Sequence, residues 1–398
     1  MTLLLAAILA ASPASPETEL ARLVRVGGVH VEDDSGTVLL SWHSDEFRTP
    51  ASVMKLATAA AALHALGPKA RLTTDFVFDP VSHGLCVVGG GDPFLVSESL
   101  RRAADSLAAL GVTDVSRLSA DCGLFVQPLE VDGLGVSANP YDAGVSAFSV
   151  NFNTVAVSIG ANGTIGSGEP ETPLTPIARE MGKKAGRRGD HRLPIRNGVT
   201  TAPLYALELL REILRERGIS VGDSTSLEPC TPSSVRYRHQ SQQSVEGVVA
   251  AMLEYSNNVI ANMLMLAAAA RENGGRPVGM ADGVAMVRAF LADELRFEGF
   301  EVKEGSGLSR ANRLTPRQIV ALLHHLRDHG YDLLLPLYKG VRAKTGTLAG
   351  VTCLAGYMTL QDGRTASFAI LLEGNVGLRD RVLTLLKGRL AAAGDGAQ

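Results

Sequence analysis

Residues 50–66 read PASVMKLATAAAALHAL, and the rest of the chain can be interpreted outward from them. The stretch is rich in Ala and Leu, and Gly67-Pro68 follows it, so a helix should begin near Ser52 and end at the glycine. Residues three apart share a helix face, which puts Lys55 one turn after Ser52. A desolvated lysine near other cations can take the proton of a serine hydroxyl. Ser-x-x-Lys therefore predicts a nucleophile and its base, although the pattern alone also arises by chance.

A second short motif, Ser256-Asn257-Asn258, lies before an apolar helical run. A hydroxyl here can relay a proton to a leaving amine, and the Asn258 amide can hold a substrate carbonyl and the first lysine. Taken singly, the motif is more typical of an ordinary helix N-cap.

A third motif, Lys344-Thr345-Gly346-Thr347, comes before a β-like run that starts at Val351. Gly346 lets a substrate backbone approach the strand edge, and Lys344 with Thr345 or Thr347 can bind a carboxylate. A backbone N–H beyond the glycine can face an oxyanion. Alone, these residues are an ordinary turn into a strand.

Together, the motifs follow the order Ser-x-x-Lys, Ser-x-Asn, Lys-Thr-Gly, an established signature of penicillin-binding proteins and serine β-lactamases. The chain resembles the class C low-molecular-mass penicillin-binding proteins, the D-Ala-D-Ala carboxypeptidases and endopeptidases, in which a large insertion separates the first two motifs. Further stretches carry the resemblance over nearly the whole chain: residues 50–56, 89–93, 149–153, 305–310 and 314–316.

Some features depart from the family pattern. Asn257 stands where an aspartate is frequent, at a position that varies, and Glu304 stands where an aspartate often precedes Gly-Ser-Gly. The insertion is shorter than in larger members, which puts the preferred substrate size in doubt but not the chemistry.

The resemblance implies an α+β penicillin-binding/serine β-lactamase-like transpeptidase fold, an antiparallel sheet with flanking helices that carries a large mixed α/β insertion. We expect residues 1–20 to be a leader, residues 21–72 and 236–398 to form one discontinuous catalytic domain, and residues 73–235 to be inserted. Strands are expected at 24–31, 37–42, 75–78, 84–88, 145–159, 351–359 and 365–373. Helices are expected at 97–110, 244–272, 283–295, 315–329 and 378–392.

The resemblance also implies a role for each motif residue. Ser52 attacks the carbonyl between two D-Ala residues of a peptidoglycan stem peptide, and Lys55 takes its proton. Ser256 passes a proton to the departing D-Ala, with Lys344 tuning the relay, and Asn258 positions the acyl group. Thr345 and Thr347 bind the terminal carboxylate beside Gly346, and backbone N–H groups of Ser52 and Thr347 form the oxyanion hole. β-Lactams should acylate Ser52 and leave slowly, and no metal or cofactor is required.

Composition excludes other classes of protein. The 398 residues carry a formal net charge of −3, which argues against a nucleic-acid protein, and no segment after the leader is apolar for the length of a membrane span. Four cysteines, at 86, 122, 230 and 353, fit no zinc spacing, and three disulfide pairings or free thiols remain open.

Two features concern location. Residues 1–14 are apolar and then small, which is typical of a secretory signal; no basic residue precedes them, so a misassigned start or a buried helix is the alternative. We expect an exported, periplasmic or extracellular protein associated with the cell wall. One basic stretch is a solvated loop or a contact with anionic envelope polymer: Lys183, Lys184, Arg187, Arg188, Arg192 and Arg196.

Two other functions remain as alternatives. A serine β-lactamase or esterase shares the acylation groups but needs fast deacylation, and the wide insertion disfavours it. A non-catalytic wall-binding relative is disfavoured by the intact trio of motifs. Sequence does not separate carboxypeptidase from endopeptidase action.

Overall fold

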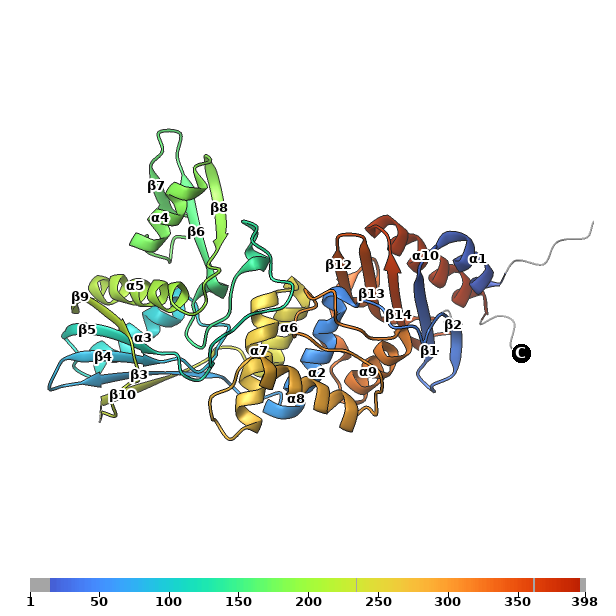
Figure 1. Ribbon diagram of the computed structural model, residues 1–398, viewed down its shortest axis with the longest axis horizontal. Coiled ribbons are helices and arrows are strands. Elements are labelled where there is room, and N and C mark those ends of the chain that lie inside the picture. Colours follow the sequence, from blue (N-terminus) through green and yellow to red (C-terminus); the bar gives the residue numbers. More distant parts are fainter. Residues whose placement is uncertain (1–14, 234, 361, 394–398) are drawn as a thin grey trace, which may run out of the picture.

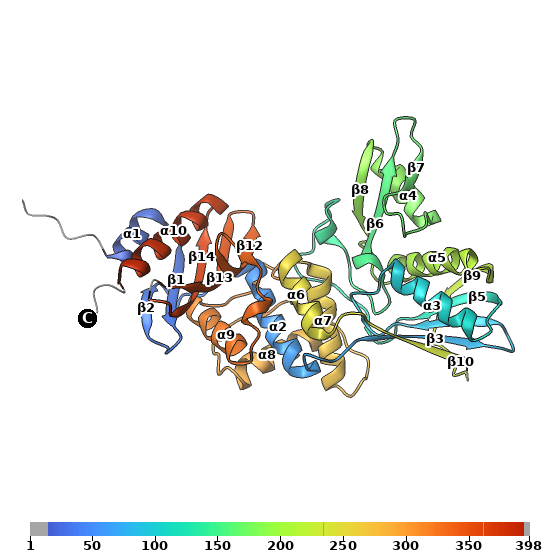
Figure 2. The same cartoon turned by 180° about the vertical axis from the view of Figure 1, so that it is seen from behind.

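The computed structural model describes residues 15–233, 235–360 and 362–393. In Figure 1 the first and last parts of the chain lie together at one end of an elongated molecule, and the middle of the chain forms the other end. Figure 2 shows the same division from behind. We call residues 15–72 and 241–393 the terminal domain and residues 73–240 the inserted domain.

The terminal domain is built on a six-stranded antiparallel sheet with the order β11-β12-β13-β14-β1-β2. Its strands are β1 (Gly27–Asp33), β2 (Val38–Trp42), β11 (Leu337–Tyr338), β12 (Val341–Leu348), β13 (Val351–Thr359) and β14 (Thr365–Glu373). Because β1 pairs with β14 along its whole length, both ends of the chain share one sheet. Alternate residues of a strand face opposite sides, so Cys353 and Ala355 pack in one hydrophobic core, and Leu354 and Met358 pack in the other.

Helices cover both faces of this sheet. α1 (Pro16–Leu23) and α10 (Val376–Ala393) pack side by side on one face, and α9 (Pro316–Asp328) packs on the other (Figures 1 and 2). Beyond α9 lie α2 (Lys55–Leu66), α6 (Val245–Tyr255), α7 (Asn258–Glu272) and α8 (Met280–Asp293). Every residue of α2 from Lys55 to Leu63 is buried, as expected for a helix that is apolar on all sides.

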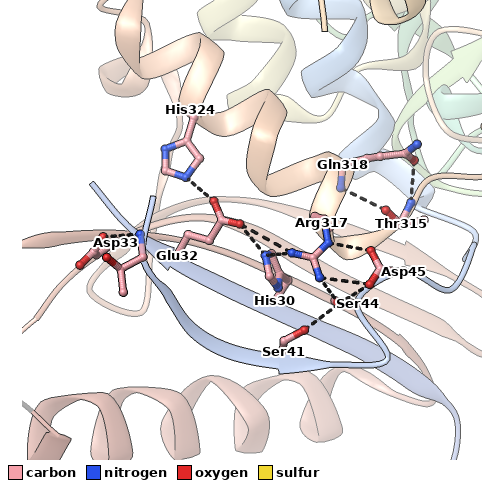
Figure 3. Close-up of polar contacts among 11 residues, drawn as sticks. His30, Glu32, Asp33, Ser41, Ser44, Asp45, Thr315, Arg317, Gln318 and His324 are labelled. Carbon is pink, nitrogen blue, oxygen red and sulfur yellow. Dashed lines mark hydrogen bonds and ion pairs between the residues drawn. The ribbon is translucent and has the colours of Figure 1, made fainter. Parts of the chain in front are cut away.

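Polar groups tie α9 to the sheet. Figure 3 shows Glu32 between His30 and His324, with Arg317 of α9 beside Asp45. Burial lowers the pKa of His30 below its ordinary value, more than the hydrogen bond to Glu32 raises it. Burial therefore favours the neutral form of His30 within this network.

The helix expected over 244–272 is interrupted. Ser256 adopts the left-handed conformation (φ 52°, ψ 35°), which stops the hydrogen-bond ladder of α6. Asn257 then caps α7, its side-chain oxygen accepting from the Ile260 N–H at 3.0 Å. The N-cap interpretation therefore holds for Asn257, and Ser256 lies at a sharp corner between two helices.

The inserted domain contains two sheets. The larger has the order β10-β3-β4-β5-β9, with strands β3 (Thr73–Asp79), β4 (Gly84–Val88), β5 (Asp114–Asp121), β9 (Ser220–Leu227) and β10 (Val235–Gln240). Helices α3 (Ser97–Ala109) and α5 (Thr201–Glu216) pack in the same core as its apolar residues. The smaller sheet joins β7 (Ile165–Ser167), β6 (Thr154–Ile159) and β8 (Gly189–Pro194), and with α4 (Pro176–Ala185) it stands away from the rest in Figure 1.

Several expected boundaries differ from those observed. The strand that starts at residue 235 pairs with β3 through Gln240, so residues 236–240 extend the inserted sheet and do not belong to the terminal domain. The strand expected over 145–159 exists only from Thr154, because residues 151–153 adopt positive φ. Of the expected leader, residues 1–14 lie outside the described residues, whereas Leu20 is buried in α1.

The inserted domain is fixed to the terminal domain by packing. Four side chains of the inserted domain are buried in the core formed by α2, α7 and α8: Phe125, Val131, Ala143 and Val145. A backbone bridge between Phe125 and Val278 reinforces this contact. The two domains therefore share a continuous apolar interface.

One disulfide links Cys86 of β4 to Cys230, and Cys122 and Cys353 are free. Of the pairings that the sequence left open, the structure therefore shows one disulfide and two free thiols. In the described part of the chain, no helix has the length and apolar character needed to cross a membrane.

Replacing Cys86 and Cys230 together by serine should lower the free energy of unfolding by about 2–4 kcal/mol, because the bond joins residues 144 apart and restricts the unfolded chain. Chemical denaturation of the oxidised protein measures this loss. Cys122→Ser, which replaces a free cysteine and leaves the disulfide intact, is the control. Equal midpoints for the double variant and the wild type would contradict the expectation.

Candidate active site

Ser52 lies in a 3₁₀ turn, Ala51–Met54, that leads directly into α2. The residue before it, Ala51, is buried and has φ +47°, a left-handed conformation that costs a non-glycine residue about 1–3 kcal/mol. This turn brings the Ser52 Oγ to 3.2 Å from the Lys55 Nζ. The two residues of the first motif are therefore in contact, as their spacing predicts.

Lys55 is fully buried and meets three oxygen acceptors. Its Nζ donates to the Asn258 Oδ1 at 2.7 Å, to the Ser306 carbonyl at 2.7 Å and to the Ser52 Oγ. Burial lowers the pKa of Lys55 well below its ordinary value, the charge of Lys344 lowers it further, and Glu304 opposes both. A lysine in this state gives up its proton more readily than an exposed one and can then accept the proton of Ser52.

Asn258 connects Lys55 to the inserted domain. It is the first residue of α7, and its Oδ1 accepts from Lys55 while its Nδ2 donates to the Tyr141 carbonyl at 3.2 Å. The loop around Tyr141 is held by buried Asp142, which accepts from the Gly135 and Ser137 backbone N–H groups. One wall of the site therefore comes from the inserted domain.

Ser256 is half-buried at the corner between α6 and α7. Its hydroxyl makes no hydrogen bond to any described residue, and the Lys344 Nζ donates instead to the Thr345 carbonyl at 3.0 Å. The structure thus joins Ser52, Lys55 and Asn258 through hydrogen bonds, whereas no such bond joins Ser256 to Lys344.

Lys344 of β12 is 1% exposed. Burial lowers its pKa from 10.5 to about 8, the charge of Arg379 on α10 adds to the lowering, and Glu254 of α6 opposes it. The charge of Lys344 also lowers the pKa of Lys55, and Lys344 lies two residues before Gly346, whose backbone packs against the turn that carries Ser52. A second lysine that can exchange protons near neutral pH therefore lines the site.

Gly346 permits a close approach of the Pro50–Ser52 backbone, whereas we expected the approach of a substrate backbone. A side chain here would lie 2.8 Å from the Pro50 carbonyl oxygen and 3.1 Å from the Ser52 nitrogen. The glycine therefore lets β12 pack against the turn that carries Ser52, and the backbone after it lies beside the nucleophile. Thr345 is half-buried and Thr347 is exposed on the same strand.

The sequence did not point to Glu304 as part of the site. Its side chain is completely buried and anchors the loop of residues 304–309, whose Ser306 carbonyl accepts from Lys55. Gly307 in this loop has φ +86°, and a side chain there would overlap the Ala51 carbonyl oxygen. The sequence marked Glu304 only as an acidic residue before Gly-Ser-Gly, where an aspartate is frequent in the family, and assigned it no role in the site. Among the described residues, no group of three or more His, Cys, Asp and Glu could hold a metal ion.

Solved structures with the same architecture define the class of protein. Penicillin-binding protein 4 (dacB) from Haemophilus influenzae superposes with a TM-score of 0.75 at 20% identity, over 91% of this chain and 95% of that chain. A predatory endopeptidase from Bdellovibrio bacteriovorus superposes with a TM-score of 0.55 at 19% identity, over 92% of each chain. The fold is that of the serine penicillin-binding proteins, and the expected fold class is confirmed.

Sequence comparison defines the family. The model of the D-Ala-D-Ala carboxypeptidase 3 (S13) family matches residues 7–181, 188–333 and 332–384, and the chain belongs to this family. A D-alanyl-D-alanine carboxypeptidase from an Actinomadura species is 28% identical over 88% of this chain and 78% of that protein. Carboxypeptidase DacB from Mycolicibacterium smegmatis is 26% identical over 99% and 85%. The chain is therefore a serine-type D-Ala-D-Ala carboxypeptidase, as its motifs suggest.

Replacing Lys344 by methionine should make the stability less dependent on pH. The pKa of Lys344 is about 8 in the folded chain and 10.5 otherwise, so its burial is unfavourable below pH 8 and the penalty fades as pH rises to 10.5. The stability advantage of Lys344→Met over the wild type should shrink by about 3 kcal/mol between pH 7 and pH 10.5. Chemical denaturation across this range measures it, with Lys69→Met, which removes an exposed lysine, as the control. A constant difference between Lys344→Met and the wild type would contradict it.

Proposed function

We propose that this carboxypeptidase works through a covalent ester on Ser52, with Lys55 as the base. The observation that carries the proposal is the buried Lys55 Nζ, within 3.2 Å of the Ser52 Oγ and held by the Asn258 and Ser306 oxygens. The lowered pKa of Lys55 supports its role, because a base must be partly neutral at the working pH.

In the first step, the Ser52 oxygen forms a bond to the carbonyl carbon between the two D-Ala residues, and Lys55 takes the hydroxyl proton. Backbone N–H groups of Ser52 and Thr347 stabilise the oxyanion, a role supported by the close packing of Gly346 on Ser52. The carbon–nitrogen bond then breaks and leaves the acyl group on Ser52. Water then attacks this ester: its proton passes through Ser256 to Lys344 and replaces the one used for the leaving amine, and Lys55 returns its proton to the Ser52 oxygen as the carbon–oxygen bond breaks.

The departing amine needs a proton, and Ser256 supplies it in our proposal. Its hydroxyl has no described partner, so it is available to the substrate, and Lys344 can replace the proton because its pKa is about 8. Lys344, Thr345 and Thr347 bind the terminal carboxylate through charge and hydroxyl groups. Asn258 holds the acyl group beside the lysine that it already contacts.

The same chemistry can release either a terminal D-Ala or a peptide cross-link, because only the leaving amine differs. We therefore infer that endopeptidase action uses the same residues. The supporting observation is that Thr347 at the end of the motif strand is exposed, so that the strand edge is open beyond the carboxylate site.

We further propose that the chain is exported and works in the cell envelope. The Cys86–Cys230 disulfide supports an oxidising compartment, because such bonds are rare where thiols are kept reduced. A substrate in the peptidoglycan requires the same location.

The smaller inserted sheet carries a candidate contact with envelope polymers. Of the six charges in its basic stretch, Arg192 contacts Glu169, Lys183 contacts Glu180 and Arg196 contacts the Ser137 carbonyl. The side chains of the remaining three are exposed and form no hydrogen bond or ion pair with the described residues: Lys184, Arg187 and Arg188. We propose that these three, which form the basic tip, bind phosphate- or carboxylate-bearing wall polymer.

Ser52→Ala should abolish both labelling by a fluorescent penicillin and release of D-Ala from a D-Ala-D-Ala peptide, because no hydroxyl remains to be acylated. Ser256→Ala should still label at Ser52 but about 10²–10⁴-fold more slowly, because it loses a proton donor. Mass spectrometry locates the label. Labelling that survives in Ser52→Ala would show a different nucleophile, and rapid turnover of nitrocefin by the wild type would favour a β-lactamase.

Replacing the three basic-tip residues by glutamine should weaken binding to wall sacculi about 100-fold at low salt, at about 1 kcal/mol per charge near an anionic surface. Sedimentation of the protein with sacculi, with and without their phosphate-bearing polymers, measures this. The matched control replaces Arg22, Arg25 and Arg381, which are exposed on the terminal domain, and should bind like the wild type. Equal binding by both triple variants would refute the contact.

A further inference from the structure

Glu304 is a buried carboxylate beside the reacting groups that the proposed mechanism leaves without a role. It is 0% exposed, and six hydrogen bonds converge on its two oxygens. Its Oε1 accepts from the Gly307 and Ser309 backbone N–H groups and from the Asn312 Nδ2, at 2.6, 3.2 and 2.9 Å. Its Oε2 accepts from the Ser306 N–H, the Ser306 hydroxyl and the Asn262 Nδ2, at 2.7, 2.5 and 3.3 Å. All six donors are neutral, so they hold a negative charge without cancelling it.

The loop that Glu304 anchors is part of the environment of Lys55. The Ser306 carbonyl accepts from the Lys55 Nζ, and the Gly305 carbonyl accepts from Thr58 one turn later on α2 at 2.6 Å. Gly307 packs on the Ala51 carbonyl oxygen, directly before the nucleophile. If the loop moved, Lys55 would lose an acceptor and Ser52 would lose the surface behind its turn.

The charges that face Lys55 come from two other elements. Lys344 of β12 disfavours a protonated Lys55, and Glu304 favours it; both effects act on a group that is itself fully buried. Arg379 and Glu254 act on Lys344, and Asp132 of the inserted domain reaches the loop through the Ser309 hydroxyl. Among these groups, Glu304 is the only negative charge that acts on Lys55 directly.

We propose that Glu304 is a positioning residue that holds the 304–309 loop against Lys55 and sets the pH range in which Lys55 activates Ser52. This inference rests on the proposed function of Ser52 and Lys55. Glu304 compensates part of the unfavourable burial of the Lys55 ammonium, so that at a given pH a larger fraction of Lys55 is protonated and hydrogen-bonded to the loop. Without the negative charge, Lys55 would be neutral at lower pH and would hold the Ser306 carbonyl less tightly.

The sign of the pH effect follows from the need for a neutral base. Acylation falls on the acid side as Lys55 becomes protonated, and the charge of Glu304 moves this fall to higher pH. Glu304→Gln should therefore shift the acid limb of the acylation profile to lower pH by about one unit, and should also lower the maximal rate because its amide group faces donors. Glu304→Asp keeps the charge and should keep the midpoint within about 0.3 units.

The experiment measures the rate of penicillin acylation of the full chain from pH 5 to pH 10. Asn312→Ala is the matched control, because it removes one hydrogen bond from the same carboxylate and leaves the charge in place. A midpoint that does not move in Glu304→Gln, or that moves equally in Asn312→Ala, overturns the proposal. Mass spectrometry of the adduct separates this failure from failure of the proposed function, which would put the label on a residue other than Ser52.

A measurement on the wild type decides the matter if Glu304→Gln does not fold. Infrared spectroscopy with isotope-labelled glutamate follows the carboxyl bands through the acid limb. A carboxylate that persists across the limb supports the proposal. Protonation of a buried glutamate in step with the loss of acylation would show that Glu304, and not Lys55, titrates there, and would overturn it.

Discussion

The burial of the Lys55 ammonium group is the constraint on which the rest of the site depends. An ammonium removed from water is strongly unfavourable unless each of its protons meets an acceptor. Here the acceptors come from three places in the chain, the turn before α2, the start of α7 and the loop that follows Glu304. The helical core has to bring these segments together, and the mostly Ala and Leu composition of α2 allows its neighbours to approach closely from all sides.

A second requirement is close contact between backbones. Gly346 and Gly307 both pack against the turn that carries Ser52, and a side chain at either position would overlap that turn. The proposed nucleophile therefore contacts both a strand of the sheet and a loop of the helical core. These two contacts oppose relaxation of the left-handed Ala51.

Local patterns account for much of what could be predicted. Spacing alone correctly put Lys55 beside Ser52, and Thr315 caps α9 as its place before a proline suggests. The single helix expected over 244–272 was wrong, because the left-handed backbone of Ser256 ends α6, whereas the N-cap interpretation of the same motif correctly marked the start of α7. The place of Gly346 against Ser52 depends on partners far apart in the chain, and the hydrogen bonds around Glu304 come mostly from an irregular loop that it forms with its own neighbours. Periodicity carries no information about such contacts, and the disulfide partner of Cys86 was open for the same reason.

The hydrogen bond from Asn258 to the Tyr141 carbonyl has a consequence for the architecture of the enzyme. The amide that orients the base is itself oriented by a residue from the middle of the chain, and Phe125 and Val145 bury apolar surface in the same core. A shortened chain that lacks residues 73–240 would therefore lose one wall of the active site and expose apolar surface that is now buried. The insertion is a separate block in the sequence but not in the structure, so substitutions far from the terminal domain should be tolerated better than substitutions near Tyr141, Phe125 and Val145.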